Sequence, residues 1–280
     1  MKFHGSDSAC KSALASDGSG GGSTDVTDTA RVQSIEQEFA QLTAAERIGR
    51  FRAVVVGRVV FTTSFGLEDQ VILHFICERE HDIDVVTLDT GRLFPETYAL
   101  WADSEHRYGR RIHALYPERR GLEAFVAEHG INGFYDSRAA RLACCGVRKV
   151  EPLGRALKGA KGWIAGLRAE QSAHRQGMQL LSADARGLLK LNLLFDWTWA
   201  QTLDFANSHS VPVNPLHAQG FASIGCAPCT RAIQPGEPER AGRWWWEDEA
   251  KKECGLHVTA NGRVERGESG SEAAKGRADP

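Results

Sequence analysis

The chain lacks any long apolar segment. No run approaches the roughly 18 apolar residues that are needed to span a bilayer, and the first thirty residues lack the apolar core of a secretory signal. The chain also lacks an excess of charge of either sign, since 34 lysines and arginines face 36 aspartates and glutamates and leave a net charge of −2. Neither a membrane nor a nucleic acid is therefore expected as a partner, and any anion site must be local.

A cysteine pattern suited to a disulfide scaffold is absent too. The seven cysteines are odd in number and partly clustered. Without an export signal they indicate a reducing compartment, so we expect a cytoplasmic protein that uses cysteine for metal binding or catalysis. The 280 residues, 42% of them hydrophobic, are enough to build a substantial core.

Composition divides the chain into four parts. Residues 1–30 are rich in Gly, Ser, Asp and Ala and predict a disordered leader. Residues 31–233 are predicted to form a nucleotide-binding α/β domain. Residues 234–260 contain two prolines and three consecutive tryptophans, and they predict a tail that docks through its aromatic rings. Residues 261–280 are polar and are expected to be disordered.

Short strand-like runs alternate with segments of helical spacing. Val59–Thr63 predicts a buried strand that turns through a Ser/Gly loop into a helix, and Asp84–Leu88 predicts a second strand. One packed helix is expected before them, and further sheet segments are expected at residues 111–116, 163–167 and 188–195. This alternation predicts an α/β fold with a mostly parallel, doubly wound sheet and helices on both faces.

Several predicted strands end in residues that could contact a nucleotide. Ser64 and Gly66 form a loop that would present backbone N–H groups and a helix N-terminus to a phosphate. An ordinary N-cap at Ser64 is the alternative, and on this loop alone it is the better explanation. Leu88 and Asp89 end the second strand, where a carboxylate can reach ribose hydroxyls, and Arg168 adds a cation at the same predicted edge.

The tandem pair Cys144 and Cys145 has a counterpart in Cys226 and Cys229. Four thiolates select zinc or an iron–sulfur cluster over magnesium or calcium. Adjacent side chains diverge, which fits poorly around one tetrahedral ion and better around a cubane, so the pair favours a 4Fe-4S cluster. Buried thiols beside an unrelated Cys-x-x-Cys are the alternative. The segment is also basic, which would stabilise a net-negative cluster and an anionic substrate: Arg138, Arg141, Arg148, Lys149 and Arg155.

Cys254 stands apart from this set, near the end of the predicted tail. Gly255 would let its backbone approach a site closely, and His257 follows. Basic groups lower the pKa of a cysteine and so favour the reactive thiolate. A tail that closes over these groups would make Cys254 a nucleophile. The expected groups are Lys149, Arg168, Arg240 and Arg243.

Seven blocks of the sequence together resemble the bacterial assimilatory adenylylsulfate (APS) reductases, the iron–sulfur branch of the APS/PAPS reductase family. They follow in order over about residues 55–257: SFGLED (64–69), LDTGRLFPETY (88–98), CCGVRKVEPL (144–153), GLRAEQS (166–172), GCAPCTR (225–231), GRWWWE (242–247) and ECGLH (253–257). The resemblance implies an adenine nucleotide α-hydrolase-like fold.

The resemblance also implies a reaction in sulfate assimilation. Cys254 would attack the sulfur of APS, form a thiosulfonate and release AMP, after which thioredoxin would liberate sulfite. Cys254, Lys149 and His257 are the expected catalytic residues, and the 4Fe-4S cluster would place Lys149 against the substrate instead of donating electrons. The expected substrate contacts are Ser64, Gly66, Leu88, Asp89, Arg168, Arg240 and Arg243.

Three other functions compete with this one. A PAPS reductase, or an enzyme that accepts both nucleotides, would differ only in its substrate. A sulfur-inserting tRNA enzyme would need a basic RNA surface, which the net charge of −2 does not favour. A non-catalytic zinc-binding module would use the same four cysteines. The chain carries no fused thioredoxin-like domain, so a separate dithiol protein is expected, and a homo-oligomer is left open.

Overall fold

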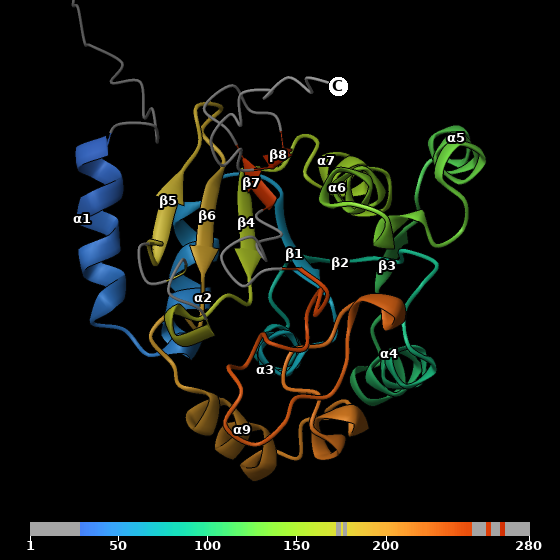
Figure 1. Cartoon of the computed structure of the whole chain (residues 1–280). Coiled ribbons are helices and arrows are strands. Elements are labelled where there is room, and N and C mark those ends of the chain that lie inside the picture. Colours follow the sequence, from blue (N-terminus) through green and yellow to red (C-terminus); the bar gives the residue numbers. More distant parts are fainter. Residues whose placement is uncertain (1–28, 172–174, 176–177, 248–255, 259–263, 267–280) are drawn as a thin grey trace, which may run out of the picture.

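Six strands form the central sheet, in the order β3-β2-β1-β4-β6-β5 (Figure 1). The structure is a computed structural model, and it describes residues 29–171, 175 and 178–247 with the backbone of 256–258 and 264–266. The strands are β1 (Val59–Thr63), β2 (Asp84–Leu88), β3 (His113–Leu115), β4 (Gly162–Ala165), β5 (Leu181–Ala183) and β6 (Leu189–Asn192). All neighbouring strands pair parallel except β5, which runs antiparallel to β6.

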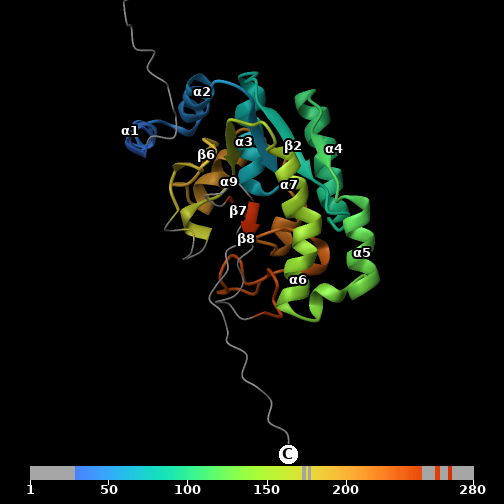
Figure 2. The ribbon, with the colours of Figure 1, turned by 90° about the horizontal axis from the view of Figure 1, so that it is seen from above.

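Helices cover both faces of this sheet (Figure 2). The helices of the described chain are α1 (Thr29–Ala40), α2 (Ala44–Val54), α3 (Leu67–Glu78), α4 (Pro95–Tyr108), α5 (Arg119–His129), α6 (Arg138–Cys145), α7 (Glu151–Ala156) and α9 (Trp199–Ser208). Short 3₁₀ turns lie at Gly133–Tyr135, Ala169–Gln171, Pro215–Gln219 and Ala227–Cys229, and a π-helical turn lies at Gly146–Val150.

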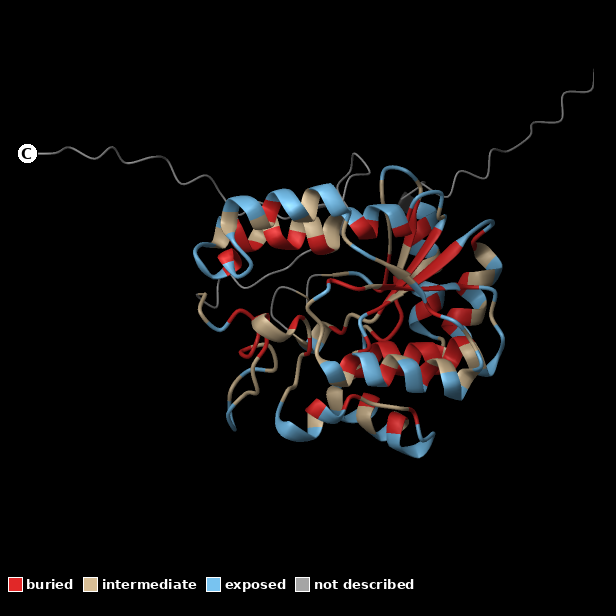
Figure 3. Ribbon diagram, turned by 90° about the vertical axis from the view of Figure 1, so that its right-hand side faces the viewer, coloured by how far each residue is buried: buried red, intermediate tan, exposed pale blue. Residues whose placement is uncertain are grey.

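Successive residues of β1 show how the two layers arise. Val59 and Phe61 are fully buried in the larger core, which includes residues of α2, α3 and α9. Val60 points to the other face and packs with Leu153 and Ala156 of α7. This alternation is what a strand with two covered faces requires, and Figure 3 shows buried residues on the sheet-facing sides of the helices. The predicted mostly parallel, doubly wound fold is confirmed.

The N-terminal helical segment differs from the prediction. The sequence predicted one packed helix, and the structure has two, α1 and α2. Thr43 separates them because it starts α2 with a capping box: its side chain accepts from the backbone of Glu46, whose carboxylate accepts from the backbone of Thr43. A capping box satisfies two helix N–H groups at once and so fixes a new helix start.

The carboxyl ends of β1, β2 and β4 lie side by side because these strands are parallel neighbours. Ser64, Asp89 and Arg168 therefore come to one edge of the sheet, as the sequence predicted. A two-stranded hairpin, β7 (Leu256–Val258) and β8 (Val264–Arg266), lies against α7 (Figures 1 and 2). In the ranges that the structure describes, no helix combines the length and apolarity that crossing a membrane requires.

Candidate active site

The four paired cysteines line a single pocket at this edge. Cys144 and Cys145 end α6, Cys226 directly precedes the turn Ala227–Cys229, and Cys229 is the last residue of that turn. Each cysteine is 8% exposed. The rest of the lining is largely basic: Arg92, Phe134, Arg141, Arg148, Lys149 and Pro228. The structure thus brings together the two cysteine pairs, which lie about eighty residues apart in the sequence, and places Lys149 beside them.

A change of helical pitch places Lys149 in this pocket. Directly after Cys145 the helix continues as the π-helical turn Gly146–Val150, and α7 follows without a break. Such single π turns are frequent at functional sites, because they shift side chains relative to the regular α-helical faces. The tandem cysteines and Lys149 consequently line the same pocket although they belong to successive turns.

The loop after β2 holds the cysteine turn in place. The Thr90 hydroxyl lies 3.3 Å from Cys226 Sγ, and the backbone N–H of Ala227 donates to the carbonyl of Arg92 at 2.8 Å. The buried Arg148 guanidinium donates to the carbonyl of Thr90 at 2.5 Å. The cysteine pocket is therefore tied directly to the strand end that carries Asp89.

The pocket disfavours free thiolates. Burial raises the pKa of the Cys229 thiol to about 12, the neighbouring Cys226 adds to this, and Lys149 and Arg243 only partly oppose it. Burial also raises the pKa of the Cys144 thiol, against the pull of Arg148. Since a thiolate is the reactive form of cysteine, these sulfurs are poor nucleophiles unless a metal displaces their protons.

Ser64 does not cap a helix. The N-cap of α3 is Gly66, which has no side chain to do so. The backbone N–H and hydroxyl of Ser64 instead donate to Asp69 Oδ2 at 2.6 and 2.8 Å. Burial raises the pKa of Asp69 to about 7, against the effect of these two hydrogen bonds. Phe65 between them has a φ of 60°, a left-handed conformation that is uncommon for a bulky residue.

Gly166, after β4, makes room for the Asp69 carboxylate. A Cβ at position 166 would lie 2.3 Å from Asp69 Oδ1, closer than any real contact. The loop after β1 and the strand end before Arg168 therefore meet at a point where only glycine fits.

Asp89 is held rigidly at the end of β2. Its Oδ1 accepts from the backbone N–H of Gly91 and from the hydroxyl of Tyr98, both at 2.8 Å. Asp89 is buried, whereas Leu88 before it is half-buried. Burial, with Asp89 as a further cause, raises the pKa of Tyr98 to about 12, so this hydroxyl remains a donor.

Arg168 is enclosed instead of lining an open edge. Its side chain is 0% exposed, and three carboxylates contact it: Glu68 at 2.6 Å, Glu170 at 2.7 Å and Glu239 at 2.8 Å. Burial tends to lower the pKa of Arg168, but Glu68 and Glu239 outweigh it and raise that pKa. The predicted substrate contact is thus surrounded by acidic groups that the sequence analysis did not identify.

Arg243 differs from Arg168 in having unused donor capacity. It is buried, and its Nη1 donates to the carbonyl of Ile224 at 3.2 Å. Its buried Nε has no hydrogen-bond partner among the residues that the structure describes. The guanidinium packs on Gly225, where a Cβ would lie 2.3 Å from Nη2. A buried, underused guanidinium is suited to an anion.

Trp244 anchors the segment that leads toward Cys254. It is 1% exposed, and the guanidinium carbons of Arg141, Arg243 and Arg240 lie 4.6, 4.9 and 5.9 Å from the centres of its rings. Its backbone N–H donates to the carbonyl of Cys229 at 3.1 Å. The anchor is therefore shared with the cysteine pocket.

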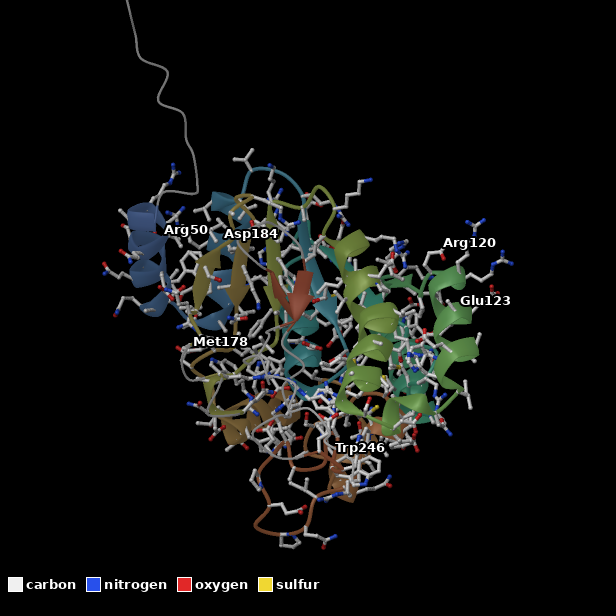
Figure 4. The ribbon with its side chains drawn as sticks, turned by 45° about the horizontal axis from the view of Figure 1, so that its top comes forward. Arg50, Arg120, Glu123, Met178, Asp184 and Trp246 are labelled. Atoms are coloured by element: carbon white, nitrogen blue, oxygen red, sulfur yellow. The ribbon has the colours of Figure 1, made fainter. Side chains whose placement is uncertain are left out.

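Glu247, three residues later, fixes the end of this segment. It forms a bidentate pair with the fully buried Arg141 at 2.8 and 2.6 Å. Next to it Trp246 packs edge-on against Tyr135 and lies below α6 in Figure 4. Trp245, in contrast, is 39% exposed. The predicted docking of the tail through its rings therefore holds for Trp244 and Trp246.

Two of the predicted catalytic residues, Cys254 and His257, have no described side chain. Cys254 lies outside the described residues, and of His257 only the backbone, in β7, is described. Glu239, Glu247 and Thr90 contact the site but had not been predicted from the sequence. Glu247 and Thr90 lie inside the matching blocks, but sequence spacing does not reveal their partners Arg141 and Cys226, which are 106 and 136 residues away.

Known proteins resemble most of this chain. The model of the phosphoadenosine phosphosulfate reductase domain matches residues 58–232. The adenosine 5'-phosphosulfate reductase of Sinorhizobium fredii is 53% identical over 81% of this chain and 93% of its own length. That of Agrobacterium fabrum is 52% identical over 82% and 88%. The crystal structure of a phosphoadenylyl-sulfate (PAPS) reductase from Candida auris, in complex with phosphate, superposes with a TM-score of 0.63 at 26% identity, covering 74% of this chain and 98% of that one.

Proposed function

The chain belongs to the phosphoadenosine phosphosulfate reductase domain family, and from this we propose that it reduces adenylylsulfate (APS) to sulfite and AMP in sulfate assimilation. The observation that carries the proposal is the pocket in which four cysteines and Lys149 lie together. The relatives that are about half identical bear the name of this activity. We place the enzyme in the cytoplasm, as the cysteine usage predicts.

The proposed reaction has two steps. In the first, the Cys254 thiolate attacks the sulfur of APS, the bond from sulfur to the bridging oxygen breaks, and AMP leaves with the electron pair. In the second, a thiolate of thioredoxin attacks Cys254 Sγ and releases sulfite, and the second thioredoxin thiol then resolves the mixed disulfide. Sulfur is thereby reduced by two electrons, and thioredoxin is oxidised to its disulfide.

Cations are needed in the first step because the sulfuryl oxygens repel an anionic thiolate. Lys149, Arg243 and Arg240 are the candidates that lie in or beside the cysteine pocket. Positioned charges of this kind typically contribute roughly 2–4 kcal/mol each to transition-state stabilisation. Arg168 can contribute to transition-state stabilisation only if its carboxylate partners move away from the guanidinium.

The four cysteines suit a 4Fe-4S cluster. They are soft ligands in one pocket, and burial disfavours the free thiolate forms of Cys144 and Cys229. Within the described part of the chain, no three His, Cys, Asp or Glu side chains converge on a position for a single ion. The side chains of the adjacent residues Cys144 and Cys145 diverge, which fits a cluster with separate iron corners better than one zinc ion. The cluster would supply a fixed negative charge and a rigid support, which hold Lys149 in position.

Metal analysis tests this cofactor. Protein purified without oxygen is expected to be brown, to contain iron and acid-labile sulfide, and to lose both in Cys229→Ser, because each ligand holds one corner. Cys77→Ser is the matched control, since Cys77 lies on α3 away from the pocket. Colourless parent protein that contains zinc would support the zinc-binding module instead.

Asp89 favours APS over PAPS. A carboxylate that contacts the ribose would repel the additional 3′-phosphate of PAPS, and Asp89 is fixed by Tyr98 and Gly91. We expect kcat/KM for APS to exceed that for PAPS at least about tenfold, a difference of about 1.4 kcal/mol. Sulfite release measured with thioredoxin and each nucleotide checks this. Comparable values would indicate an enzyme that accepts both, and release from PAPS alone would indicate a PAPS reductase.

A further inference from the structure

The surroundings of Arg168 carry an excess of negative charge. One guanidinium contacts Glu68, Glu170 and Glu239 and is itself fully shielded from solvent. If all three carboxylates are ionised, the group carries a net charge of −2; the side chain of Glu170 is 51% exposed, whereas those of Glu68 and Glu239 are 10% and 19% exposed. Burying unbalanced charge is costly unless something compensates it. The arrangement is therefore a poor receptor for an anion as it stands.

Two of the three carboxylates, those of Glu68 and Glu170, also accept hydrogen bonds from other residues. Glu68 lies in the first turn of α3, where the helix dipole favours a negative charge, and it also accepts from Gln171 at 2.9 Å. Glu170 also accepts from the backbone N–H of Trp199, at the start of α9, at 2.7 Å. Removing either one from Arg168 would disturb a helix end or a neighbouring hydrogen bond.

Glu239 differs from both. Arg168 is the hydrogen-bond partner that the structure gives it within the described ranges. Glu239 lies near the start of the predicted tail, residues 234–260, and its side chain keeps 19% exposure, so it has a path to solvent. Burial raises the pKa of Glu239 even though Arg168 lowers it.

We propose that Glu239 is an internal substitute for the substrate anion. Before substrate binds, its carboxylate accepts a hydrogen bond from Arg168 Nη2. When an anionic group of the sulfonucleotide binds to Arg168 in its place, the Glu239 side chain turns out toward solvent. The inference rests on the proposed function, because it requires that Arg168 contact the substrate. A side-chain rotation is sufficient. The backbone around Glu239 is held on either side by hydrogen bonds from Ala241 to the carbonyl of Pro238 and from Arg231 to that of Gly242.

This displacement would make Glu239 a determinant of affinity. To bind Arg168, a ligand must replace the charge-assisted hydrogen bond from Arg168 to Glu239. A neutral group would gain no binding free energy from this exchange, whereas a sulfate or phosphate would. The alternative is that Glu239 merely positions Arg168 for the substrate, which predicts the opposite effect on binding.

Binding of APS to Glu239→Gln separates the two. In a Cys254→Ser background, which prevents turnover, we expect the substitution to tighten the Kd for APS about tenfold, because a neutral amide competes less well for Arg168. Glu239→Ala should act in the same direction. The control is Glu237→Gln, in the same segment, since Glu237 pairs with Arg231 at 2.8 Å and should change Kd by less than about twofold.

The outcomes are distinct. Weaker or unchanged binding of APS in both Glu239 variants, with normal binding by the parent protein, would overturn the inference and assign Glu239 a positioning role. If the parent protein itself failed to bind APS, the proposed function would fall and the inference with it. Tighter binding is a result that a purely structural role for Glu239 does not produce.

Discussion

Cys254→Ser is expected to reduce sulfite release at least about a thousandfold while APS binding and iron content stay at parent values. A serine hydroxyl is not ionised near neutral pH, so the variant has no anionic nucleophile for the sulfur of APS. The measurement is sulfite release under anaerobic conditions with thioredoxin, together with APS binding and the visible spectrum. Retention of both would show that only chemistry is lost.

The environments of the other cysteines support this choice of nucleophile. Burial raises the pKa of Cys144, Cys229 and Cys77, which disfavours the reactive thiolate at all three. Cys77→Ser is therefore a matched control that should retain activity. Incubation with APS alone, followed by intact-mass and peptide analysis, should place a sulfonate on Cys254. An adduct on a pocket cysteine, or undiminished turnover in Cys254→Ser, would contradict the mechanism.

Much of the fold could be predicted because its signals are local. Val59–Thr63 and Asp84–Leu88 are strands with the predicted bounds, since β-branched runs that are buried on both faces leave a clear pattern. The antiparallel strand β5 was missed, because three residues, Leu181–Ala183, carry no usable periodicity. The break at Thr43 was missed as well, although its Thr and Glu spacing is a recognisable helix-start signal.

The site was predicted less completely because its electrostatics depend on distant pairs. The sulfurs and Lys149 share a pocket, as their chemistry had suggested. Arg168, however, had been predicted as a cation at the substrate-binding edge without acidic partners, and its partners Glu68 and Glu239 are 100 and 71 residues away. Arg141 and Glu247 are 106 residues apart. Pairing over such separations is set by how the strands and helices come together, which spacing along the chain does not encode.

Lys149→Ala is expected to lower turnover of APS about a hundredfold to a thousandfold while the iron content is retained. Lys149 lines the cysteine pocket from the π-helical turn and is half-buried, so its ammonium acts in a partly desolvated setting where charge is weakly screened. Steady-state kinetics with iron and sulfide analysis checks this. Lys158→Ala, an exposed lysine just beyond α7, is the matched control and should change turnover little.

The neighbouring Arg148 shows why Lys149 is the better test of electrostatics. Arg148 is buried and bonded to the carbonyl of Thr90, so its loss would disturb the loop that holds Cys226. Lys149→Ala removes a charge from the pocket without breaking that link. Lys149→Arg should restore part of the turnover, because it restores the charge with a different shape. A colourless, aggregated Lys149→Ala protein would instead show that Lys149 supports the cysteine pocket structurally, and its role toward the substrate anion would then have to be abandoned.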